Sequence, residues 1–406
     1  MKLLLSTILF SFFSLYTFSQ NKLKTGRWLA KMQITSEDVL PFEILINKDQ
    51  GNYLLSVVNA EENITLTKPK VISNDSLEVE FPYFRSILRF KVTDKKHING
   101  RWYNLYKKNY SIPFSAEVSK ENRFQHISTN KSPVDFSGKW EVYFEPGTSE
   151  QYPAVGVFEN TNESSIKGTF MTETGDYRYL SGNVQNDSLY LSCFDGSHAF
   201  LFKAKYSENS LHGKFFSGKH WQSEWIGTKN ETFELTSPEE LTQTTEKPLQ
   251  FNLRKLNGDV YSYPNKDLQG KVVIIQIMGS WCPNCLDETQ YYKKLYDKYH
   301  SAGLEIVAVG YETGDDFEQH TMNIKRLVDR LQLPYTILVG GTAKKSLASE
   351  HFAALNEIIS FPTSIYIARD GTIRRIHTGF NGPGTGNKYI EYMQQTNALI
   401  ESLLAE

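Results

Sequence analysis

The chain of 406 residues is too long for one hydrophobic core and indicates several domains, while its apolar share of 40% is ordinary for a soluble protein. The formal net charge of -2 gives no support to a nucleic-acid partner, whose phosphates call for a basic surface. Glycine and proline occur at ordinary levels, so most of the chain is expected to fold.

The N-terminal segment combines one basic side chain, Lys2, with an apolar stretch over residues 3–16 and small residues after it. This pattern is typical of a secretory signal, and we expect residues 1–19 to be removed. The apolar stretch falls short of the roughly 20 residues that span a bilayer, which leaves an uncleaved anchor as the alternative. The sequence therefore predicts a periplasmic or otherwise extracytoplasmic location.

The chain repeats itself over residues 20–130 and 131–232. Gly-Arg-Trp at 26–28 recurs as Gly-Lys-Trp at 138–140, and the same spacing carries Asn-Asp-Ser-Leu at 74–77 onto an identical run. Within each copy, short runs of alternating apolar and polar residues are separated by turn signals, which is typical of an antiparallel meander. Each copy is predicted to be an all-β unit, a small barrel or sandwich, unless both share one larger barrel.

The β repeats carry no evident chemistry, and the sequence identifies no ligand for them. Their tryptophans are expected to belong to the core rather than to a ligand platform: Trp28, Trp102, Trp140 and Trp221. Cys193 lies in a strand-like run of the second copy and is expected to be a small buried apolar residue.

Residues 233–248 are polar, rich in threonine and glutamate and without periodicity, so we interpret them as a linker. From residue 249 the pattern changes to alternating strands and helices, which predicts an α/β domain over 249–406. A hairpin and a continuous apolar strand at 272–278, of the kind that lies inside a covered sheet, come first. The remaining predicted elements are a helix at 283–301, a strand at 304–310, a helix at 315–331, a strand at 335–339, a helix at 343–355, two strands turning at Asp370-Gly371, and a last helix reaching Leu404.

Cys282 and Cys285 stand where the apolar strand gives way to the helix that begins near Pro283. The pKa of a thiol is lowered where backbone N–H groups and the helix dipole point at the sulfur, and Cys282 has that position. Pro283 suits the first helical turn, where its missing N–H leaves no hydrogen bond unmade. Cys285, one turn on, can close a ring with Cys282 and resolve a mixed disulfide. The pair is predicted to be a redox dithiol.

Two other uses of the cysteine pair have weaker support. A structural disulfide between residues three apart closes too small a loop to constrain the unfolded chain much. A zinc site would need two further ligands, and only Cys193 and scattered histidines remain. No metal and no organic cofactor is therefore expected.

Two longer runs, GKVVIIQIMGSWCPNC at 270–285 and ISFPTSIYIARDGTIRRIHTGF at 359–380, are similar to the thioredoxin superfamily. The C-terminal domain resembles in particular the TlpA/ResA-like extracytoplasmic thiol-disulfide oxidoreductases, with an extra helix and strand at 315–339. The resemblance extends from about residue 249 to the C-terminus and implies nothing about the β repeats. It implies a thioredoxin-like fold and exchange of electrons with protein cysteines.

The resemblance assigns Cys282 as the nucleophile and Cys285 as the resolving cysteine. It places Pro362 in a cis-proline loop that lies against the dithiol and pairs with substrate backbone. It also implies that Trp281 and Phe361 contact the substrate. From the residues alone, Pro362 indicates only the start of a strand.

Glu288 matches an acidic residue that this family often carries three positions after the second cysteine. On a helix it shares a face with Cys285 and could exchange protons with that thiol, unless it is an ordinary solvated glutamate. Gln276 stands where thioredoxins place a buried aspartate. That departure argues against a second carboxylate base and leaves Glu288 as the better candidate.

The sequence thus predicts an enzyme, a periplasmic thiol-disulfide oxidoreductase that acts on cysteine-containing proteins through a Cys-Pro-Asn-Cys dithiol. The family resemblance favours a reductant that receives electrons from a membrane electron-donor protein. The alternative is an envelope binding protein in which the β repeats capture a partner and the C-terminal domain is accessory. A peroxidase of the same superfamily is not favoured, because IQIMGSWC lacks the proline and threonine of the Pro-X-X-X-Thr-X-X-Cys motif.

Overall fold

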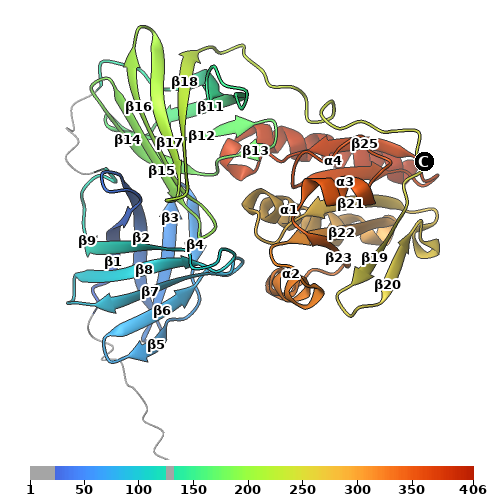
Figure 1. Ribbon diagram of the computed structural model, residues 1–406, viewed down its shortest axis with the longest axis horizontal. Helices are drawn as coiled ribbons and strands as arrows, with labels where there is room; N and C mark the ends of the chain where they lie inside the picture. The colour runs from blue at the N-terminus through green and yellow to red at the C-terminus, as the bar shows by residue number, and fades with distance from the viewer. Residues whose placement is uncertain (1–22, 125–131) are drawn as a thin grey trace, which may run out of the picture.

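The computed structural model describes residues 23–124 and 132–406, which form two all-β units followed by a C-terminal domain of mixed sheet and helices (Figure 1). The predicted signal segment, residues 1–19, lies outside the described residues. No helix within the described ranges is both long and apolar enough to cross a bilayer. The C-terminal domain lies beside both β units, which are stacked on each other in Figure 1.

The first β unit is an antiparallel sheet of nine strands in the order β4-β3-β2-β1-β9-β8-β7-β6-β5. Its strands are β1 (Gly26–Gln33), β2 (Val39–Asp49), β3 (Asn52–Asn59), β4 (Glu62–Thr65), β5 (Lys70–Ser73), β6 (Ser76–Glu80), β7 (Ser86–Val92), β8 (His97–Asn104) and β9 (Ser111–Val118). Strands β4 and β5 stand at opposite ends of this order, so the sheet remains open.

The second β unit is also antiparallel and has the order β11-β10-β18-β17-β16-β15-β14-β12-β13, with β11 paired to β12 as well. Its strands are β10 (Gly138–Phe144), β11 (Tyr152–Asn160), β12 (Ser165–Thr172), β13 (Gly175–Asp176), β14 (Leu180–Gln185), β15 (Ser188–Phe194), β16 (Ala199–Ser207), β17 (Ser210–Ser217) and β18 (Trp221–Lys229). The β11–β12 pairing closes this sheet into a barrel. The two units are separate sheets, so the alternative of one shared larger barrel is wrong.

The repeat in the sequence is also a repeat in the structure. Trp28 on β1 and Trp140 on β10 are both buried in the core of their unit. Each indole N–H donates to the backbone carbonyl four residues earlier, of Lys24 and Phe136 respectively, at 2.9 Å in both cases. The shared Gly-X-Trp motif therefore fixes the entry into the first strand of each unit in the same way.

The expected placement of the other large and sulfur-containing side chains is confirmed with one exception. Trp102 and Cys193 are buried, as predicted. Trp221 is 51% exposed, and the prediction that it belongs to the core is wrong. It is the first residue of β18, directly after the turn that follows β17, and it is exposed at this end of the strand, whereas Trp225 further along the same strand is buried.

The C-terminal domain has a seven-stranded sheet in the order β20-β19-β23-β22-β21-β24-β25, in which β21, β22 and β23 run parallel. Its strands are β19 (Phe251–Lys255), β20 (Val260–Tyr263), β21 (Val272–Met278), β22 (Leu304–Glu312), β23 (Thr336–Thr342), β24 (Thr363–Ile367) and β25 (Ile373–Thr378). Its helices are α1 (Pro283–Tyr299), α2 (Phe317–Leu331), α3 (Lys345–His351) and α4 (Asn387–Ala405), with short 3-10 turns η1 (Lys266–Leu268), η2 (His300–Ala302) and η3 (Pro383–Thr385).

Helices cover both faces of this sheet. Alternate residues of β21 point to opposite sides, because successive side chains of a strand do so. Val272 and Ile274 pack with the core that includes α1, α2 and α4, whereas Val273 and Ile275 pack with the core that includes α3. The strand is buried along its whole length, as the continuous apolar run predicts, and the predicted thioredoxin-like α/β class is confirmed.

Residues 233–248 contain no helix or strand, but they contact the C-terminal domain. Thr242 is buried, and the backbone of Thr245 and Gln243 exchanges hydrogen bonds with Ala354 and Asn356 at 2.7 and 2.9 Å. α3 ends at His351, earlier than predicted, because the backbone of Phe352, with φ of -108° and ψ of 49°, leaves the helical region. The segment that we interpreted as a linker from the sequence thus lies along the C-terminal domain.

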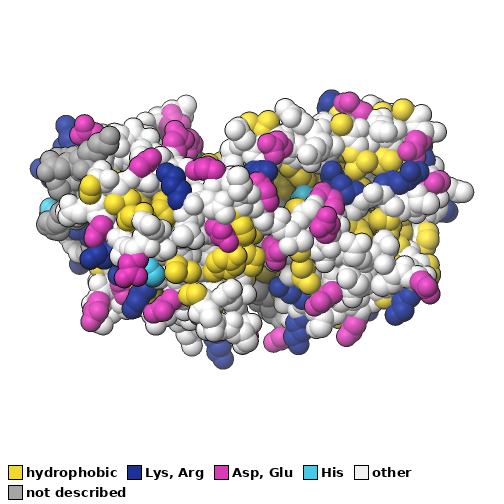
Figure 2. Space-filling model, turned by 90° about the horizontal axis from the view of Figure 1, so that it is seen from above, with side chains coloured by type: hydrophobic (Ala, Val, Ile, Leu, Met, Phe, Trp, Pro, Cys, Tyr) yellow, Lys and Arg dark blue, Asp and Glu magenta, His cyan; other side chains and the backbone are white. Residues whose placement is uncertain are grey.

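Charged side chains are mixed over the surface. Figure 2 shows acidic and basic groups interspersed on the face drawn, with no broad region of a single sign. This distribution agrees with the small net charge and with the absence of support for a nucleic-acid partner in the composition.

The core of the second β unit consists only of residues from its own part of the chain, from Phe136 to Trp225. A chain ending at residue 232 is therefore expected to keep this unit folded, because no side chain of the C-terminal domain contributes to that core. Circular dichroism and tryptophan fluorescence should show β-structure and a cooperative thermal transition. A disordered product would contradict the prediction.

Candidate functional site

The site is built at the turn from β21 into α1. Cys282 is the N-cap residue of α1, with extended backbone angles of -97° and 116°, and Pro283 occupies the first turn. The backbone N–H of Cys285 donates to Cys282 Sγ at 3.2 Å. Because this N–H and the helix dipole both point at the sulfur, the position stabilises a Cys282 thiolate.

Cys282 and Cys285 are joined in a disulfide, with their Cα atoms 5.2 Å apart. Cys282 is 6% exposed and Cys285 is fully buried, so Cys282 is the more accessible of the two. Both residues are nevertheless enclosed by the rest of the chain. The third cysteine, Cys193, is free, and burial raises the pKa of its thiol well above the ordinary range, which makes it unreactive.

The Phe361–Pro362 peptide bond is cis, as the resemblance implies. The carbonyl oxygen of Phe361 lies 3.5 Å from Cys282 Sγ, so this loop faces the dithiol. Trp281 donates its indole N–H to the carbonyl of Tyr311 at 2.9 Å, and its ring meets that of Phe361 edge to face at 6.1 Å. The structure therefore brings Trp281, Phe361 and Pro362 together around Cys282.

Glu288 is fully buried, and the alternative that it is a solvated glutamate is wrong. Its carboxylate accepts hydrogen bonds from Gln276 Nε2 at 2.8 Å, Ser364 Oγ at 3.0 Å and Tyr292 Oη at 3.1 Å. Burial raises the pKa of Glu288 to about 7, although these three donors oppose the shift. A carboxyl group with this pKa can gain or lose a proton near neutral pH.

Gln276 holds the Glu288 carboxylate in place. Its side-chain amide donates to Glu288 and accepts from Thr289 Oγ1 at 3.2 Å. An aspartate at this position would bring two carboxylates into contact in a buried site, which is unfavourable. A neutral glutamine therefore suits the position beside Glu288. This explains why Gln276 stands where thioredoxins place a buried aspartate.

A second buried acid, Glu312, was not predicted. At the end of β22, it accepts hydrogen bonds from the backbone N–H and the Oγ of Ser280, both at 2.7 Å. Burial raises its pKa to about 7. It anchors the turn just before Cys282. The sheet topology could have indicated this residue. The carboxyl ends of neighbouring parallel strands meet at one edge of the sheet, and Glu312 is the last residue of β22, which runs parallel to β21.

Among the residues that the structure describes, no three His, Cys, Asp or Glu side chains are grouped so that they could hold a metal ion. The chemistry that the arrangement supports is that of sulfur. One cysteine lies at a helix N-terminus, a second lies one turn further on, and a buried carboxyl group follows on the same helix.

The Redoxin family model matches residues 243–391. A thiol-disulfide oxidoreductase ResA of Halalkalibacterium halodurans is 30% identical over 144 residues, which cover 34% of this chain and 70% of that protein. A ResA of Bacillus thuringiensis subsp. konkukian is 28% identical over 132 residues, which cover 32% of this chain and 66% of that protein.

Among solved structures, a putative thiol:disulfide interchange protein DsbE from Chlorobium tepidum is similar to 39% of this chain and 98% of its own, with 21% identity and a TM-score of 0.30. The family model and these relatives match the C-terminal portion of the chain only. The matched residues do not include the β units.

The raised pKa of Glu288 predicts a pH-dependent contribution to stability. The neutral carboxyl is the form that burial favours, so the stabilisation is complete below the ordinary pKa of 4.5 and is lost as the pH rises through about 7. In the oxidised protein, the free energy of unfolding of the wild type should fall over this range by up to about 3 kcal/mol more than that of Glu288→Gln.

Urea unfolding across this pH range would measure that difference. Glu391→Gln, which alters an exposed glutamate on α4, provides the reference for removing a surface charge. Parallel pH profiles for the wild type and Glu288→Gln would contradict the assignment.

Proposed function

Through its C-terminal domain the chain belongs to the ResA-like thiol-disulfide oxidoreductases, and we propose that it exchanges electrons with cysteines of other proteins through the Cys282–Cys285 dithiol. The position of Cys282 carries this proposal: it caps α1 and faces the cis Pro362 loop. The raised thiol pKa and burial of Cys193 support its exclusion from the reaction.

In the first step of a reductive cycle, the Cys282 thiolate attacks one sulfur of a substrate disulfide. The substrate disulfide breaks, its second sulfur leaves as a thiolate that takes up a proton, and a mixed disulfide with Cys282 forms. The N–H of Cys285 and the dipole of α1 favour the attacking thiolate. The backbone beside Pro362 is suited to pair with the substrate, and Trp281 and Phe361 flank it.

In the second step Cys285 loses its proton and attacks Cys282 Sγ of the mixed disulfide. The second substrate thiol leaves, and the Cys282–Cys285 disulfide forms, so two electrons have passed from the dithiol to the substrate. Glu288, three residues after Cys285 on the same helix, is the group we assign to accept this proton. Its pKa of about 7 and its buried position support that role.

We assign the reducing direction, an extracytoplasmic location and a membrane electron-donor protein as parts of the same proposal. The signal-like N-terminal segment supports export. A reductant in such a compartment needs electrons to return its disulfide to the dithiol, and a membrane donor of that class would supply them. No described contact favours the alternative of a binding protein with an accessory C-terminal domain.

The order of the two cysteines can be tested by trapping. Full-length Cys285→Ser, incubated to completion with insulin, should accumulate a mixed disulfide at Cys282, because the resolving thiol is missing. Cys282→Ser should form none, and Cys193→Ser should behave as the wild type. Mass spectrometry of the adducts would identify the linked residue. Adducts on Cys282→Ser but not on Cys285→Ser would reverse the assignment.

The proton-accepting role of Glu288 predicts a kinetic effect. Glu288→Gln should leave the first attack by Cys282 nearly intact and slow resolution of the mixed disulfide by about 10²- to 10⁴-fold, since Cys285 must lose a proton first. Stopped-flow measurements between about pH 5 and pH 9 would show the mixed disulfide accumulating. Unchanged resolution over this range would leave Glu288 without the role.

A further inference from the structure

A segment of the second β unit lies against a residue between the two cysteines. We call residues 172–179 the covering loop. The side chain of Asn284, between the two cysteines, donates to the carbonyl of Asp176 at 3.3 Å. Gly175 has a φ of +146°, and a Cβ there would be 2.1 Å from Asn284 Nδ2, so the approach requires glycine.

The covering loop also lies against the proline loop. Ser360, two residues before Pro362, donates its hydroxyl to the carbonyl of Thr174 at 3.0 Å. The backbone N–H of Gly382 donates to Asp176 Oδ2 at 2.6 Å. The covering loop thus occupies the side from which the backbone of a protein substrate would reach Pro362.

Other parts of the β units close the remaining approach. Ser197 of the second β unit donates its hydroxyl to the carbonyl of Trp281 at 2.9 Å. Tyr106 of the first β unit donates its hydroxyl to the carbonyl of Ser280 at 3.4 Å. With Cys282 only 6% exposed, the disulfide of a polypeptide cannot approach its sulfur in this arrangement.

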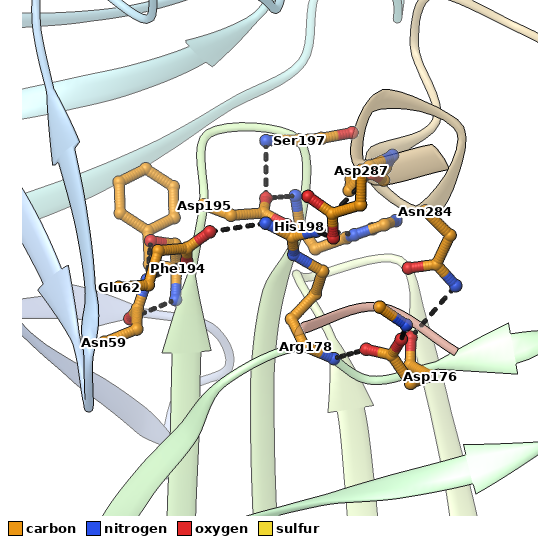
Figure 3. A network of polar contacts seen from close by, with 12 residues as sticks. Asn59, Glu62, Asp176, Arg178, Phe194, Asp195, Ser197, His198, Asn284 and Asp287 are labelled. Carbon is orange, nitrogen blue, oxygen red and sulfur yellow. Dashed lines mark hydrogen bonds and ion pairs between the residues drawn. The ribbon is translucent and has the colours of Figure 1, made fainter. Parts of the chain in front are cut away.

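Arg178 fastens the covering loop to its surroundings, as Figure 3 shows. Its guanidinium forms ion pairs with Asp287 of α1 and with Glu62 of the first β unit. It also lies 3.7 Å from Asp195 of the second β unit and donates to the carbonyl of Pro283 at 3.4 Å. A single side chain therefore joins both β units to the first turn of the redox helix.

These contacts are buried, which makes them strong determinants of the closed arrangement. Arg178 is 4% exposed; burial opposes its charge, but the surrounding carboxylates keep its pKa well above the ordinary range. Removing one partner of a buried ion pair leaves an uncompensated charge and is strongly destabilising, whereas exposed pairs contribute little. Loss of Arg178 should therefore release the loop.

We propose that Arg178 and the covering loop control access to Cys282 and thereby determine which disulfides the dithiol accepts. A protein substrate reacts only after the loop has left Asn284 and the Pro362 loop, so partners able to displace it are selected over other disulfides. The inference rests on the proposed function, because it concerns the same dithiol and adds a step before the first attack.

Two full-length variants open the loop in different ways. Arg178→Met removes the charge that holds the loop. Gly175→Ala leaves the charge in place and breaks the loop's contact with Asn284, because the added Cβ displaces the Asn284 amide and a side chain strains a backbone with a φ of +146°. Arg326→Met is the matched control, since Arg326 joins α2 to the first β unit through Glu80 and the carbonyl of Phe81, at contacts outside the covering loop.

Two rates are measured on each reduced protein: alkylation of Cys282 by iodoacetamide, read by mass spectrometry of the labelled peptide, and reduction of insulin. Arg178→Met and Gly175→Ala should each raise both rates by about tenfold or more, while Arg326→Met stays near the wild type. If Arg178→Met fails to fold, Gly175→Ala carries the test.

Equal alkylation in all four proteins, or an equal gain in Arg326→Met, overturns the inference. If the wild type reduces insulin as fast as Arg178→Met and Gly175→Ala do, the inference about access control is also overturned. The proposed function is unaffected by that result. Faster alkylation of Cys282 without insulin reduction in any protein supports the access control and contradicts the proposed function.

Discussion

The turn from β21 into α1 is the constraint on which the rest of the site depends. β21 is buried inside the sheet between β22 and β24, so its carboxyl end fixes where α1 begins and where Cys282 caps it. Cys285 and Glu288 then follow at one-turn intervals along α1. The antiparallel pairing of β24 with β21 brings Pro362, at the start of β24, back beside the same point. A few local interactions thus assemble a sulfur site from distant parts of the C-terminal domain.

Burial is the second physical property that unites the site. Three carboxyl groups around the first turns of α1, those of Asp287, Glu288 and Glu312, have a pKa of about 7 because each is withdrawn from water. For Asp287, part of that enclosure comes from the β units, through Arg178. The β units are therefore part of the environment of the dithiol, although the matched relatives share only the C-terminal portion.

Features with local causes could be predicted from the sequence. Pro283 and Gly303 bracket α1 closely, and the period-two runs reveal the strands of both units, because caps and alternation act between near neighbours. The contacts of Arg178 could not be predicted, since they join residues more than 100 positions apart in the chain. Glu312 was missed although the parallel pairing of β21 and β22 offered a signal for it. The exposure of Trp221 at the first residue of its strand had no signal in the alternating pattern.

The most direct test of the account is a redox titration of the full chain. Protein equilibrated in buffers of defined potential would be alkylated, and labelling of each cysteine would be measured. We expect one reversible two-electron couple at Cys282 and Cys285, with a tenfold change in the ratio of reduced to oxidised protein for about 30 mV, and Cys193 unlabelled in the folded protein. The absence of a reversible couple at this pair, or labelling that follows Cys193, would contradict it.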